Sequence, residues 1–126
     1  MFFSLLLLAV LGGDCTVMTE GEAQIVAETN LARAEAGLPE LVVDCRLMGR
    51  ARRHANRMAT EGFFAHSGGA IENIASGQAH AQAAVRSWLG SPGHRANIMN
   101  RRYSRIGVAG YVGRDGKTYW VQQFAP

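Results

Sequence analysis

The spacing of polar and hydrophobic residues predicts a helix near the start of the domain. Thr19 is followed three positions later by Glu22, which is the pattern of a capping box, and the helix should begin there. Gly37 is expected to end it, and Pro39 follows two residues later. We therefore expect a helix over residues 20–36, followed by a short extended link over residues 41–43.

A second helix is expected over residues 45–61, because Asp44 is a good N-cap and Gly62 a good terminator. One face of it carries apolar residues at core spacing, and another carries only arginines. The two stripes are Leu47, Ala51, Ala55, Met58 and Arg46, Arg50, Arg53, Arg57. We interpret the arginine stripe as a solvated face, although it could also be an anion- or envelope-binding strip. His54, at the border, is expected to be packed and hydrogen-bonded.

The middle of the chain mixes irregular and helical signals. FFAHSGGAIENIASG, residues 63–77, is aromatic and glycine-rich and is expected to be irregular. A third helix is expected over residues 79–89, with His80 exposed off its core face. SPGHRANIM, residues 91–99, predicts a short fourth helix with Ser91 as N-cap and Pro92 at the first helical position. This places His94 in the first turn.

Two β-rich runs close the chain and flank Asp115-Gly116, which is a hairpin signal. The helices precede these strands and do not alternate with them. The predicted class is therefore α+β with an antiparallel sheet. A chain of 126 residues fits one domain.

The first residues, MFFSLLLLAVLGGD, have the character of a leader. The apolar run is too short to span a bilayer but has the length of a signal-peptide h-region, and small residues follow it. We expect residues 1–14 to be a signal peptide or hydrophobic leader and residues 15–126 to be the domain. A retained anchor and a lipoprotein modified at Cys15 are the alternatives, but Asp14 is a poor residue for lipoprotein processing.

Cys15 and Cys45 are the two cysteines of the chain. In an exported protein, an even number of cysteines predicts one disulfide, with two free thiols as the alternative. The net charge of +3 is mild, and it gives no reason to expect a nucleic-acid partner.

Three residues are candidates for chemistry. His94 lies at the positive end of a helix dipole, which favours the neutral imidazole that metal ligation or proton acceptance requires. His66 sits in a loop after two aromatic residues, and Glu72 follows between apolar neighbours. Together they could form a divalent-metal site or an acid/base group. Alternatively, His94 belongs to a well-built helix start, and a turn or a partner accommodates Glu72.

Five segments occur in an order that resembles the CAP superfamily of cysteine-rich secretory, antigen 5 and pathogenesis-related 1 proteins. They are FFAHSGG, IENIASG, AVRSWLGSPGHRANIMN, YSRIGVAGYV and YWVQQFA. The chain is most similar to the short bacterial SCP-like domains of this family. The likeness extends over residues 20–124 and includes Asn30 and Arg33.

This resemblance implies a three-layer α-β-α sandwich with a central antiparallel sheet and about four helices. It also implies a secreted protein, extracellular or periplasmic, with a cavity lined by two histidines and two glutamates. His66, Glu72 and His94 match three of these residues, and Ser91 stands where longer members have the second glutamate. In relatives the cavity histidines can hold zinc or another divalent cation.

From these observations we expect a secreted, non-enzymatic binding domain. His66 and His94 would hold a divalent cation such as zinc, with Glu72 as a ligand or an outer partner. The ligand would be a peptide, a lipid or an envelope component. We expect a monomer, no nucleic-acid partner, and membrane contact only through a retained leader.

A metal-assisted hydrolase is the rival hypothesis, with a zinc-bound water as nucleophile and Glu72 as general base. A structural or interaction domain with a vestigial cavity is the third. The chain contains no G-x-S-x-G motif, no H-E-x-x-H motif and no cysteine in a catalytic setting. We assign no catalytic residue and favour binding over hydrolysis.

Overall fold

A four-stranded sheet forms the middle layer of the molecule in a computed structural model, which describes residue 15 and residues 17–126. The predicted leader over residues 1–14 lies outside the described residues. The strands are β1 (Val42–Val43), β2 (Ile71–Ser76), β3 (Arg105–Val112) and β4 (Thr118–Ala125), in the spatial order β1-β3-β4-β2. β4 pairs antiparallel with both β3 and β2, whereas β1 adds a short parallel strand beside β3.

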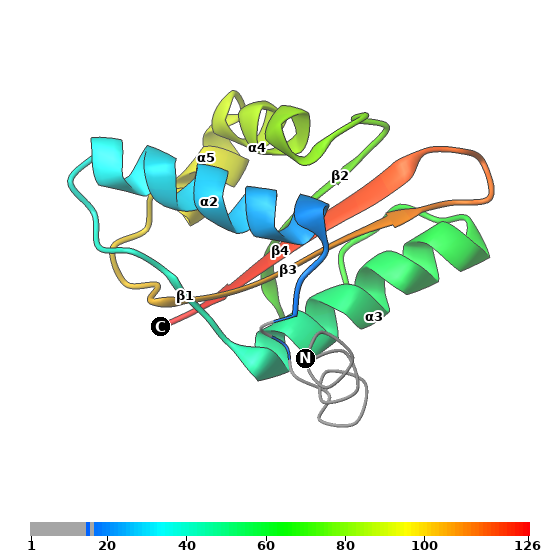
Figure 1. The fold of residues 1–126 in the computed structure, drawn as a ribbon, viewed down its shortest axis with the longest axis horizontal. Coiled ribbons are helices and arrows are strands. Elements are labelled where there is room, and N and C mark those ends of the chain that lie inside the picture. The colour runs from blue at the N-terminus through cyan, green and yellow to red at the C-terminus, as the bar shows by residue number, and fades with distance from the viewer. Residues whose placement is uncertain (1–14, 16) are drawn as a thin grey trace, which may run out of the picture.

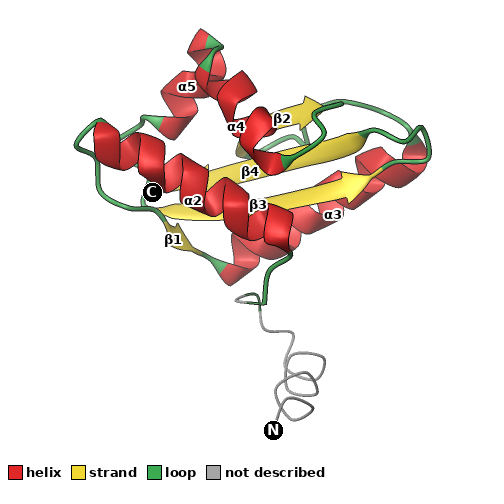
Figure 2. Cartoon of the chain, turned by 45° about the horizontal axis from the view of Figure 1, so that its top comes forward, coloured by secondary structure: helices red, strands yellow, loops and turns green. Residues whose placement is uncertain are grey.

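Helices cover both faces of this sheet (Figure 1). α3 (Cys45–Glu61) lies on one face, while α2 (Glu20–Glu35), α4 (Ala81–Leu89) and α5 (Pro92–Ile98) lie on the other. The same layers are seen after rotation in Figure 2, where β2 lies beside α4. The described residues thus contain four helices and confirm the expected α+β, α-β-α architecture.

Local signals fix the helix ends as the sequence predicts. Thr19 and Glu22 make both hydrogen bonds of a capping box, 3.1 and 2.9 Å long. The carboxylate of Asp44 accepts a hydrogen bond from the backbone N–H of Leu47 at 3.0 Å. Gly62 ends α3 in the left-handed conformation, at φ 72°, which costs glycine little.

Two sequence expectations are wrong. Residues 71–76 are a strand and not an irregular segment, because they pair along their length with β4. The polar residues Glu72 and Asn73 interrupt the alternation that would have marked a strand, and both are buried. α4 begins at Ala81 rather than residue 79, because His80 is its N-cap and accepts a hydrogen bond from the N–H of Ala83 at 3.3 Å.

The two sides of the sheet have separate cores. On the α3 side, the apolar stripe of that helix packs against all three long strands; the members include Ala51, Ala55, Met58, Ile74, Ala109 and Val121. On the other side, Trp88 and Ile25 pack with Val108 and Phe124. Gly107 lies so close to α3 that a Cβ there would collide with the backbone of Leu47. This absence of a side chain brings α3 directly onto β3.

A disulfide joins Cys15 to Cys45, with a Cα–Cα distance of 5.2 Å. It confirms the predicted pairing and ties the segment before α2 to the first residue of α3. None of the helices over the described residues combines the length and the apolar character needed to cross a bilayer.

Candidate functional site

A cavity of about 410 Å³ lies at the edge of the sheet, beside β2. Its walls come from the loop before β2, from β2 itself and from α4 and α5. The residues that line it include Phe64, His66, Gln78, Ser87, Trp88 and His94. The structure therefore brings His66 and His94 to one cavity, although Glu72 does not line it.

His66 is oriented by a buried carboxylate. Its Nδ1 lies 3.1 Å from the Oε1 of Glu72, while 60% of the His66 side chain is exposed. A carboxylate can only accept a hydrogen bond, so Nδ1 is the protonated nitrogen of the neutral ring. The Nε2 lone pair of His66 is then free for a ligand.

The Glu72 carboxylate is fully occupied by the protein. Oε1 accepts from the backbone N–H of Ser67 at 2.6 Å, and Oε2 accepts from the Ser67 hydroxyl at 3.0 Å and from Nε2 of Gln123 at 2.9 Å. Burial raises the pKa of Glu72, but these hydrogen bonds and the one from His66 outweigh it, and the pKa is lowered. Glu72 is therefore a carboxylate at neutral pH.

The backbone of His94 is held by Asn73, the residue that follows Glu72 in β2. The Nδ2 of Asn73 donates to the backbone oxygen of His94 at 3.0 Å, and its Oδ1 accepts from Nδ2 of Asn97 at 2.9 Å. Successive residues of a strand point to opposite faces. As a result, Glu72 orients His66 on one side of β2, while Asn73 holds the first turn of α5 on the other.

The far end of α5 is held by a buried arginine. Arg33 of α2 is fully buried, and its guanidinium donates to the backbone oxygens of Ile98 and Asn100 at 2.8 and 2.9 Å. It also donates to Pro39 and Tyr103 at 2.9 and 3.2 Å. Arg33 thus links α2 to the chain just after it and to the segment at and beyond the end of α5.

The start of α5 confirms one expectation and corrects another. His94 is the third residue of the helix and so lies in its first turn, as predicted, and it is half-buried. Ser91 occupies the N-cap position, but its side chain makes no capping hydrogen bond. Pro92 at the first helical position has a φ that suits a helix start without that bond.

The cavity lining includes two imidazoles, those of His66 and His94. Over the described residues, no group of three or more His, Cys, Asp or Glu side chains is placed to hold a metal ion. Glu72 already accepts four hydrogen bonds, so its chemistry suits an outer partner that orients a histidine ligand. The assignment of His66, Glu72 and His94 to a metal site remains a prediction.

Several site residues were not singled out from the sequence. Asn73 follows Glu72 in the quoted segment IENIASG. Its position next to a candidate site residue is the sequence signal that could have identified it. Trp88 was expected in the core, but it also lines the cavity, and its Nε1–H donates to the backbone oxygen of Ile74 at 3.0 Å. Gln123 carries no local signal, because only strand pairing places it opposite Glu72.

A family profile described as "CAP: Cysteine-rich secretory protein family" matches residues 26–124. The chain belongs to the CAP family. The Bacillus subtilis protein YkwD is 34% identical over 121 residues, which cover 82% of this chain and 46% of YkwD. The chain thus spans less than half the length of this relative. The quoted segments that suggested the CAP family are all within or next to the matched range.

Solved structures of other bacterial proteins have the same fold. An extracellular protein containing a SCP domain from Bacillus anthracis has a TM-score of 0.74 at 28% identity, covering 82% of this chain and 39% of that one. An outer surface protein from Borrelia burgdorferi has a TM-score of 0.74 at 22% identity, covering 86% and 94%.

Proposed function

We propose that this CAP domain is an exported binding protein that captures a peptide in the cavity beside β2. The observation that carries the proposal is the meeting of His66 and His94 at one cavity of about 410 Å³. This volume lies in the range of small-ligand sites. The cavity has apolar walls at Phe64 and Trp88 and polar groups at Gln78 and Ser87, a mixture that suits a peptide better than a lipid acyl chain.

Export is supported by two observations. The Cys15–Cys45 disulfide requires an oxidising compartment to form and persist. The similar protein from Bacillus anthracis is described as extracellular. The predicted leader at residues 1–14 would direct the export.

A divalent cation such as zinc would bind between His66 and His94. Nε2 of His66 is free, and the first turn of α5 presents His94 to the same cavity. Bound there, the cation would supply open coordination positions for a carbonyl or carboxylate oxygen of the peptide. Glu72 would keep the His66 ring in one orientation and would not act as a general base, because its oxygens are occupied.

Calorimetric titration of the disulfide-bonded protein with zinc tests the metal part of this proposal. We expect one zinc per chain, with binding lost in His66→Ala and in His94→Ala. His80→Asn is the matched control, because His80 caps α4 outside the cavity and asparagine keeps an N-cap acceptor. Because protons compete with zinc for imidazole, binding should weaken from pH 7.5 to pH 5.5. Equal zinc affinity in the wild type and His94→Ala would refute the site.

The peptide is tested separately with a random peptide library on the zinc-loaded and metal-free protein. Enrichment of peptides that is lost in His94→Ala supports the proposal. Binding to neutral lipid vesicles with no peptide enrichment would instead assign the cavity to lipids. Turnover of peptide or ester substrates that disappears in Glu72→Gln, with the fold retained, would favour the hydrolase.

A further inference from the structure

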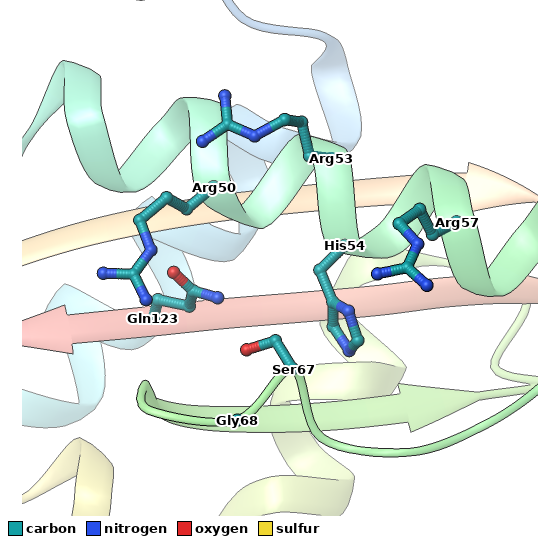
Figure 3. A pocket seen from close by; sticks show the side chains of 7 residues that line it. All are labelled: Arg50, Arg53, His54, Arg57, Ser67, Gly68 and Gln123. Atoms are coloured by element: carbon teal, nitrogen blue, oxygen red, sulfur yellow. The ribbon is translucent and has the colours of Figure 1, made fainter.

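A second hollow lies between α3 and the loop that leads into β2 (Figure 3). It has a volume of about 340 Å³ and is lined by Arg50, Arg53, His54, Arg57, Ser67 and Gln123, with the backbone of Gly68. His66 lines the cavity described above, whereas Ser67, the next residue, lines this hollow. One loop therefore separates two different pockets. We call the second the arginine pocket, and it has no role in the peptide and zinc binding proposed above.

The arginine pocket carries positive charge that the protein does not neutralise. Its three arginines recur at intervals of three and four along α3, so they share one helix face, where like charges repel. Arg57 pairs with Glu61 at 3.0 Å. The ion pairs found over the described residues include neither Arg50 nor Arg53.

Gln123 adds an unpaired acceptor at the base of the pocket. The residue is only 1% exposed, and its Nε2 donates to Glu72. The Oε1 of Gln123 is buried without a hydrogen-bond partner, a state that is rare and calls for a donor. Figure 3 shows this oxygen on the side of Gln123 that faces α3 and Arg50.

Other polar groups of the pocket already have partners within the protein. The Nε2 of His54 lies 2.7 Å from the backbone oxygen of Ala65. The Glu72 carboxylate lies behind Ser67 and Gln123, where four hydrogen bonds stabilise its charge. The guanidinium groups of Arg50 and Arg53 and the Gln123 oxygen are therefore the main groups available to a ligand.

We propose that the arginine pocket binds a phosphomonoester that carries a hydroxyl group, such as a polyol phosphate. Guanidinium groups bind phosphate oxygens with two parallel hydrogen bonds, which suits Arg50, whose guanidinium lies beside Gln123 in Figure 3. The ligand hydroxyl, or the P–OH of a singly protonated phosphate, donates to the Oε1 of Gln123. A bound phosphate also relieves the repulsion among the arginines.

Calorimetric titration with glycerol 3-phosphate, at low ionic strength and without metal, tests this inference. Arg50→Gln should weaken binding by at least about tenfold, because the loss of even one charge-assisted hydrogen bond has this effect. Arg46→Gln is the matched control, because Arg46 lies exposed on the same stripe of α3 but does not line the pocket. Glu61→Gln should tighten binding, because it releases Arg57 from its ion pair.

Two further comparisons separate a built pocket from general attraction to a basic surface. Phosphate should bind more tightly than sulfate, because sulfate has no hydrogen to donate to Gln123. His94→Ala should leave the phosphate affinity unchanged, which keeps this result independent of the zinc site. Absence of glycerol 3-phosphate binding, or equal losses in Arg50→Gln and Arg46→Gln, would overturn the inference. Equal affinity for sulfate and phosphate would overturn the role of Gln123.

Discussion

The Nδ1 of His66 lies 3.1 Å from the Oε1 of Glu72, which joins a largely exposed imidazole to a buried carboxylate. The next residue of the strand, Asn73, holds the backbone of His94. A dipeptide of one strand thus positions the two histidines that line the cavity. Two adjacent residues can do this because successive side chains of a strand point to opposite faces of the sheet.

Glu72 should make the stability of the domain depend on pH in the acid range. Its pKa in the folded protein lies below the ordinary value of 4.5. Ionised Glu72 therefore stabilises the fold above that ordinary value, and this contribution is lost as the pH falls through the lowered pKa. At pH 7, Glu72→Gln should reduce the free energy of unfolding by about 1–3 kcal/mol, because the amide cannot accept all four hydrogen bonds.

The measurement is urea unfolding of the wild type and Glu72→Gln at pH 7, 5 and 3. The difference between them should shrink as the pH falls below 4.5, because Glu72 then takes up a proton more readily in the unfolded chain than in the folded protein, where its pKa is lowered. Glu40→Gln, at an exposed position, should show no such trend. A constant difference from pH 7 to pH 3 would contradict this role of Glu72.

Removal of the disulfide should destabilise the domain. A Cys15→Ser, Cys45→Ser double variant frees a segment that the bond closes over a separation of 30 residues. The expected loss is about 3–4 kcal/mol on the chain-entropy model. Thermal unfolding of the variant and of the oxidised and reduced wild type measures it. If reduction leaves the unfolding temperature unchanged, the bond does not stabilise this fold.

Arg33→Met should loosen the segment that carries α5. The guanidinium donates to four backbone oxygens, two of them at the end of α5 and just beyond it. Leaving buried carbonyls without donors should cost at least about 2–4 kcal/mol. Hydrogen exchange should accelerate in α5 before it does so in α3. Uniform exchange across both helices would show that Arg33 stabilises the whole fold and does not act locally on α5.

Gly107→Ala should destabilise the packing of α3 on β3. A Cβ at Gly107 would collide with the Leu47 backbone, so α3 would have to move. Overpacking of this kind typically costs about 1–3 kcal/mol. Gly93→Ala is the control, since no heavy atom lies within 4 Å of a Cβ there, and it should be neutral or slightly stabilising. Chemical denaturation of both variants checks this, and equal effects would refute the steric argument.

Much of the fold could be predicted because its helices carry local signals. The capping box at Thr19 and Glu22, the N-cap Asp44 and the terminator Gly62 act within a few residues of sequence. The β3–β4 hairpin is equally local, and Gly116 adopts a φ of 81° in its turn. Ser91 shows the limit of such signals, because it takes the N-cap position without making the capping bond.

The strand β2 could not be predicted in the same way. Its polar residues are buried on both faces, and their partners lie on β4, α5 and the preceding loop. The arginine stripe was interpreted as a solvated face, and the sequence could not show the loop that closes it into a pocket. Likewise, the segments around His66 and His94 suggested a common site. The number of residues between them does not give the distance in space between a loop and a helix.

The sequence by itself determined the helices, the hairpin and the CAP family, because each depends on short-range signals or on ordered motifs. It also predicted the disulfide pairing, because the chain has only two cysteines. Only the tertiary structure decided that Glu72 is an internal partner of His66, and that Gln123 and the arginines of α3 share a pocket. The physical reason is that hydrogen bonds to a buried carboxylate depend on which strands pair and which loop folds over them. Those arrangements are properties of the whole packed chain and leave no periodic trace in any one segment.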